Sequence, residues 1–281
     1  MAPPFPGGPR SGIVSVVSTA TTLERPPERA APPSALRGFA AVFVAGGVAG
    51  VVVGGLGSRI AMRIAALTAR DVAQGLTTEA GATIGRITFE GTAFLVVAVG
   101  IGTALIGTAF YLATLPWLPR RRPLRALTFG ALELVVFGTV LLDPGNPDFT
   151  ILGRPLLNVL VLGSLFVLHG VALLLLIEPS ARLVSAVARG PRWRAGLVDV
   201  GTFLAMALTA LGAFALVARA TGWETVAMIV LLGCAAGLTV LDPHRTRPIT
   251  RPALRIAGAV SLGLVTISGI VGLLDAVTTI V

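Results

Sequence analysis

Two ionisable residues lie alone in otherwise apolar stretches of the chain. Glu133 is the only charged residue between Ala126 and Leu142, and His169 lies eight residues before a second apolar stretch ends at Ile177. Glu133 is the eighth residue of its stretch, so a helical rise of about 1.5 Å per residue places it on the order of 10–12 Å from that end of the helix. If both stretches cross a membrane, the two groups lie at similar depth.

An isolated carboxylate at the centre of a membrane helix costs about 2.5–3.5 kcal/mol on insertion scales. Glu133 avoids this cost if it stays protonated, shares a proton with His169 or pairs with an arginine. One interpretation is a proton-coupling or substrate-binding pair on a path between helices. The other is a protonated glutamate bonded to a neighbouring helix, with His169 as an interhelical donor. The sequence leaves both open.

Two further groups of polar residues are candidates for structural roles. Arg59 and Arg63 lie near the end of the first apolar stretch and Asp275 near the end of the last, which favours a salt bridge between them. The segment "DPGNPDF" at 143–149 offers side-chain oxygens to a cation. Its spacing matches no calcium loop, and its two prolines favour a simple acidic turn.

Several kinds of enzyme are excluded by composition. All 22 basic residues are arginine, so neither a Schiff-base lysine nor a Walker-type phosphate loop is available. The single cysteine, Cys234, lies in an apolar stretch and cannot form an intrachain disulfide or a cysteine-pair metal site. No H-E-x-x-H, G-x-S-x-G, cysteine–histidine metal spacing or aspartate cluster is found. We expect no enzyme, no cofactor and no metal.

The composition is that of a membrane protein. Apolar residues make up 54% of the chain and charged residues 12%, against about 25% charged in soluble proteins. Seven apolar stretches follow one another at 38–57, 92–115, 126–142, 156–177, 198–218, 225–241 and 254–279. Because lipid cannot satisfy backbone polar groups, each stretch is expected to be a helix, which predicts an all-α bundle of about seven spans. The third and sixth are short, so a re-entrant segment remains an alternative.

The chain is predicted to divide into two parts. Residues 1–37 contain eight prolines and no sustained apolar period, which indicates a disordered tail before a helical domain at 38–281. The apolar segment at 12–17 is too short for a signal peptide, so the first span is also the first targeting signal. Residues 58–91 are expected to form an ordered cap: a continuation of the first helix, then an extended piece around Ile87 and Phe89.

Arginine placement predicts the orientation. With a cytoplasmic tail, 16 arginines lie inside and six outside, so the N-terminus is inside and the C-terminus outside. The net charge of +9 therefore reflects orientation in the membrane and not nucleic-acid binding. We expect the membrane to be the cell (inner) membrane of a bacterium. The cytoplasmic arginines, with His244 in the same kind of basic turn, are candidates to contact anionic lipid headgroups.

Small residues recur every four positions in the first stretch, at Gly46, Gly50, Gly54 and Ser58. This spacing allows another helix to approach closely and predicts a face that packs against protein and not lipid. The partner helix could belong to this chain, to a second copy of it or to another membrane protein. The third and sixth stretches also end alike, in "TVLLDP" and "TVLDP". Two groups of three helices after the first helix would form an inverted repeat, as in secondary transporters.

These patterns lead to two functional hypotheses. The first is a small-solute or ion transporter in which Glu133 and His169 exchange protons or touch substrate. The alternative is a non-enzymatic membrane scaffold or accessory subunit. A membrane-embedded enzyme ranks third. A transporter requires the pair to face a water-accessible cavity, whereas a scaffold would enclose it in dry helix contacts.

Overall fold

The computed structural model describes residues 35–69, 75–76, 88–146, 148–151, 154–219, 222–240 and 250–281, and all regular structure among them is helical. The elements are α1 (Ala35–Ala49), η1 (Gly50–Gly57), α2 (Ser58–Thr68), α3 (Phe89–Phe94), η3 (Leu95–Ile101), α4 (Gly102–Thr114), α5 (Arg122–Leu141), α6 (Asp148–Ile151), α7 (Pro155–Ala188), α8 (Arg192–Arg219), α9 (Trp223–Val240) and α10 (Thr250–Ile280). Both η segments are π-helical turns within longer helices.

Six of these helices are long and apolar enough to cross a membrane, which supports the prediction of an all-α, multipass membrane protein. Two of them are composite helices: α1, η1 and α2 together (Ala35–Thr68), and α3, η3 and α4 together (Phe89–Thr114). The others are α5 (Arg122–Leu141), α7 (Pro155–Ala188), the part Arg192–Gly212 of α8, and the part Arg251–Ile280 of α10. The short third stretch is one of them, because its helix extends back to Arg122 and reaches 20 residues. The sixth stretch forms α9, which contains the shorter apolar segment Thr225–Leu238.

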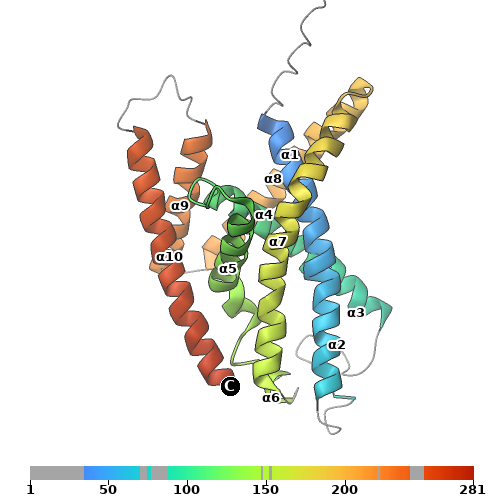
Figure 1. Cartoon of the computed structure of the whole chain (residues 1–281), viewed down its shortest axis with the longest axis vertical. Coiled ribbons are helices and arrows are strands. Elements are labelled where there is room, and N and C mark those ends of the chain that lie inside the picture. The colour runs from blue at the N-terminus through green and yellow to red at the C-terminus, as the bar shows by residue number, and fades with distance from the viewer. Residues whose placement is uncertain are drawn as a thin grey trace, which may run out of the picture. The chain divides into compact units, whose positions relative to one another are not determined.

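The helices α1, α4, α5 and α7 enclose the main core. Helix α7 packs against α1 and α5, η1 packs along η3, and α10 packs against α9 and α5 (Figure 1). The core contains Phe110, Tyr111, Phe129 and Leu173, and the rings of Tyr111 and Phe129 meet edge to face with centroids 5.1 Å apart. Such packing supplies the van der Waals contacts that hold helices together in lipid.

The small-residue face of the first helix packs against η3 and α4. A Cβ on Gly50 would lie 2.7 Å from the Cβ of Ala104, and one on Gly54 would lie 3.0 Å from Oγ1 of Thr103. The Ser58 hydroxyl, on the same face, donates to the Gly54 carbonyl. The backbones can therefore approach only because side chains are missing at the contact.

The structure differs from the sequence prediction at two boundaries. Helix α1 begins at Ala35, so Arg37 belongs to its first turns and not to a tail. Phe89 was expected in an extended piece but begins α3, because Oγ1 of Thr88 accepts the Gly91 N–H at 3.1 Å and caps the helix. The continuation of the first helix through α2 is confirmed.

Three predictions fall partly or wholly outside the described residues. Residues 1–34 hold most of the predicted tail, and residues 70–74 and 77–87 nearly half of the predicted cap. Residues 241–249 contain His244 and most of the second "TVLDP" segment. The tail, the cap and the inverted repeat therefore stay predictions.

The tight contact at Gly50 gives a stability prediction. We expect Gly50→Leu to destabilise the protein by about 1–3 kcal/mol, because the new side chain would overlap the backbone of α4. Gly38→Leu is the matched control, since a Cβ there meets nothing within 4 Å. Reversible unfolding in mixed micelles measures the difference. Equal stability of the two variants would contradict the packing described.

Candidate functional site

The candidate site is built where α5 crosses α7. A Cβ on Gly170 would lie 2.6 Å from the backbone nitrogen of Gly130, so the two helices meet there backbone to backbone. Glu133 follows Gly130 by three residues and lies on the same face of α5, and His169 is the neighbour of Gly170. The close crossing therefore places the carboxyl of α5 against the imidazole of α7.

Glu133 and His169 form a direct, enclosed pair. Nδ1 of His169 lies 3.0 Å from Oε1 and 2.9 Å from Oε2 of Glu133. Relative exposure is 2% for Glu133 and 1% for His169. The pair carries a bond whether the proton lies on the imidazole or on the carboxyl, so each polar group compensates the burial of the other. The expectation that the two residues lie at one depth is confirmed.

A glycine on a third helix makes room for the pair. A Cβ on Gly107 of α4 would lie 2.5 Å from Cε1 of His169 and 2.7 Å from Oε1 of Glu133. Only hydrogen at this position allows α4 to lie against both side chains. Gly107 is thus a site residue that sequence reasoning missed, since the stretch "IGTAF" carries no signal beyond small residues at a helix face.

Two buried polar atoms near the pair lack hydrogen-bond partners within the described part of the chain. They are Nε2 of His169 and Oγ1 of Thr108, the residue after Gly107. Gly46 of α1 faces Thr108, because a Cβ on Gly46 would overlap that hydroxyl. Nε2 of His169 and Oγ1 of Thr108 therefore keep hydrogen-bonding capacity that the contacts of the described residues do not use.

The predicted salt-bridge residues lie on different parts of the bundle. Asp275 is exposed on α10, which packs against α9 and α5. Arg59 and Arg63 lie on α2, which packs against α7, and in Figure 1 the lower parts of α10 and α2 lie on either side of α7. A salt bridge between Asp275 and either arginine therefore stays a prediction.

The acidic segment between α5 and α7 forms a turn. Oδ1 of Asp143 accepts the Gly145 N–H and Oδ1 of Asn146 accepts the Asp148 N–H, each at 2.8 Å. These bonds use the side-chain oxygens as caps for the backbone, as expected of turn residues. Cys234 is buried in α9. Among the described residues, no three histidine, cysteine or acidic side chains gather at one point as a metal site would need.

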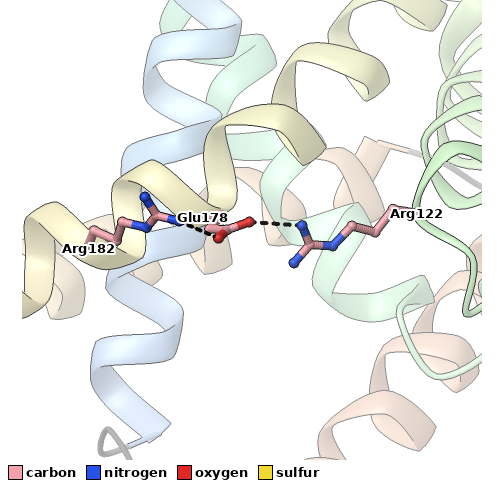
Figure 2. A network of polar contacts seen from close by, with 3 residues as sticks. All are labelled: Arg122, Glu178 and Arg182. Carbon is pink, nitrogen blue, oxygen red and sulfur yellow. Dashed lines mark hydrogen bonds and ion pairs between the residues drawn. The ribbon is translucent and has the colours of Figure 1, made fainter.

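A polar network that the sequence analysis did not identify joins the start of α5 to α7. Glu178 accepts from Nη1 of Arg122 at 2.8 Å and from Nη2 of Arg182 at 2.6 Å (Figure 2). Glu178 follows Ile177, the last residue of its apolar stretch, and is exposed. Comparisons of the chain with protein-family models, curated proteins and solved structures gave no match.

The mutual compensation of Glu133 and His169 predicts non-additive effects of substitution. His169→Leu strands a buried carboxyl and should destabilise the protein by about 3–5 kcal/mol, with a smaller loss for Glu133→Leu. The double variant should be more stable than the sum of the single losses by about 1–3 kcal/mol. Unfolding free energies of the four proteins measure this coupling, and additive losses would show that the contact contributes nothing.

The space at Gly107 gives a separate prediction. Gly107→Ala should cost about 1–3 kcal/mol, because its methyl group would overlap both His169 and Glu133. Gly102 lies on the same helix, and a Cβ there meets nothing within 4 Å, so Gly102→Ala should be neutral or slightly stabilising. Thermal unfolding of the two variants in the same detergent compares them. A neutral Gly107→Ala would rule out close packing of α4 on the pair.

Proposed function

We propose that the chain is a non-enzymatic multipass membrane protein that acts through helix contacts in the bilayer, as a scaffold or accessory subunit. The observation that carries this proposal is the enclosure of Glu133 and His169, which bond to each other and have almost no exposed surface. The carboxyl of Glu133 and Nδ1 of His169 satisfy each other inside the core and make no contact with the surface. The role of the pair is then to hold α5, α7 and α4 in one arrangement.

The surface of α8 supports this function. Most of its apolar side chains between Arg192 and Gly212 are exposed, including Leu197, Val200 and Leu211. A helix with so little packing inside its own bundle presents a long surface to lipid or to a helix of another protein. In the proposed function, that surface makes the contact with the partner.

A proton-linked transporter is the second candidate, favoured by a specific observation. Nε2 of His169 is buried without a partner in the described part of the chain, so the imidazole has hydrogen-bonding capacity that the bond to Glu133 does not use. The π-helical segments η1 and η3 pack along each other, and such segments often mark hinges or functional sites. In a transporter, the enclosed pair would belong to the occluded state.

We propose the same orientation in the membrane for the scaffold and for the transporter. Of the 22 arginines, 16 fall on one side if the chain crosses the membrane seven times, which supports a cytoplasmic N-terminus and an external C-terminus in a cell membrane. The network of Glu178 with Arg122 and Arg182 would then lie at the cytoplasmic surface.

Carbodiimide labelling of Glu133 in reconstituted protein distinguishes the two functions. A scaffold with a sealed pair predicts no labelling of Glu133 at any pH between about 5 and 9, because the reagent must reach a protonated carboxyl. Peptide mass spectrometry identifies the labelled residue, and Glu133→Gln is the control. Labelling that titrates near neutrality and shifts in His169→Ala would overturn the scaffold and support the transporter.

A further inference from the structure

An apolar groove opens on the surface of the bundle between the first helix, α4 and α8. Its volume is about 450 Å³, and its lining includes Gly47, Val48 and Val51 of the first helix, Ala104 and Leu105 of α4, and Ala205 of α8. It contains neither Glu133 nor His169. In a bilayer, an apolar groove between membrane-spanning helices suits hydrocarbon and not water.

Two arginines lie on the helix faces that line this groove. Arg37 precedes Val48 by 11 residues on the first helix, and Arg194 precedes Ala205 by 11 residues on α8. Eleven residues make close to three turns of an α-helix, so each arginine lies on the same face as its groove residue. The rise of about 1.5 Å per residue separates arginine and groove by about 16 Å along the axis.

The two arginines also belong to one junction of helices. Ala40 and Ala41 of α1 pack with Val184 of α7 and Val198 of α8. Arg37 lies one turn before Ala41, and Arg194 lies one turn before Val198. Both arginines are therefore at the same end of the same helix contact, beyond the small side chains that form it.

The charges of these two arginines are not neutralised within the described part of the chain. Arg122 and Arg182 both pair with Glu178, whereas Arg37 and Arg194 are exposed and have no carboxylate partner there. The guanidinium carbon of Arg194 lies 5.2 Å from the ring centroid of Trp193, a residue type typical of the membrane interface. Asp199 lies on another face of α8, about 140° around the helix from Arg194.

We propose that this face binds one anionic phospholipid, with its phosphate on Arg37 and Arg194 and an acyl chain in the groove. The separation of about 16 Å agrees with half of a hydrocarbon core of about 30 Å, which is the depth that an acyl chain reaches from its headgroup. Guanidinium groups bind phosphate oxygens with paired, charge-assisted hydrogen bonds. A zwitterionic lipid offers the same phosphate, but its own ammonium group offsets that charge, so two adjacent arginines favour a lipid with net negative charge. Free phosphate would leave the groove unused.

Native mass spectrometry of the full chain in detergent tests the headgroup contact. Phosphatidylglycerol and phosphatidylcholine with identical acyl chains are added in turn, and bound lipid is counted. Arg37→Gln and Arg194→Gln should each weaken phosphatidylglycerol binding about fivefold and weaken phosphatidylcholine binding much less, because the choline cation offsets the phosphate charge. Arg192→Gln is the control, because Arg192 is exposed about 160° around α8 from Arg194. An equal loss in Arg192→Gln would overturn the proposal, since it would show only general surface charge.

A second variant tests the groove. Gly47→Phe places a ring in the groove at a position where a Cβ meets nothing within 4 Å, so the fold should tolerate it. It should lower phosphatidylglycerol binding at least fivefold, whereas Gly263→Phe on α10, where the Cβ is equally unobstructed, should not. Undiminished binding in Gly47→Phe would overturn the proposal. Neither arm involves Glu133 or His169, so the lipid site can fail or hold independently of the proposed function.

Discussion

A carboxyl group inside a membrane protein must have a hydrogen-bond partner, and much of this bundle is arranged to provide one for Glu133. The partner, His169, lies on another helix, so α5 and α7 must cross closely. That crossing is possible because Gly130 and Gly170 meet without side chains, and α4 can close over the pair because Gly107 has none. The polar pair and the glycines are therefore parts of one structural solution.

The same physical constraint explains how the other helices pack. Lipid is as apolar as a leucine side chain, so burial of apolar surface does not drive helices together, and close contact depends on small residues. The first helix has such a face and packs tightly on η3 and α4 through Gly50 and Gly54. Val198 of α8 packs against the cluster that includes Ala40 and Ala41 of α1, and farther along α8 Ala205 lines a groove that hydrocarbon can fill.

A second polar contact between α5 and α7 lies at the surface of the bundle, away from the enclosed pair. Glu178 connects Arg122 at the start of α5 with Arg182 on α7, so the two helices that cross at Gly130 and Gly170 are also joined near one end. Exposed ion pairs of this kind contribute little free energy, typically about 0–1 kcal/mol. The pair of Glu178 with Arg122 is the one of the two that joins α5 to α7, whereas Arg182 lies on the same helix as Glu178. The enclosed pair matters more for stability, since breaking it strands a buried polar group.

The sequence by itself determined the features that arise within single helices. Apolar stretches of about 20 residues predicted the all-α membrane architecture, and the four-residue spacing of glycines predicted the packing face. The positions of Glu133 and His169 along their stretches predicted a common depth. Only the tertiary structure decided which helix faces meet: the bond between Glu133 and His169, and the closure by Gly107. The physical reason is that periodicity is a property of one helix, whereas contacts depend on how helices far apart in the chain rotate and cross, and small apolar residues allow many such crossings.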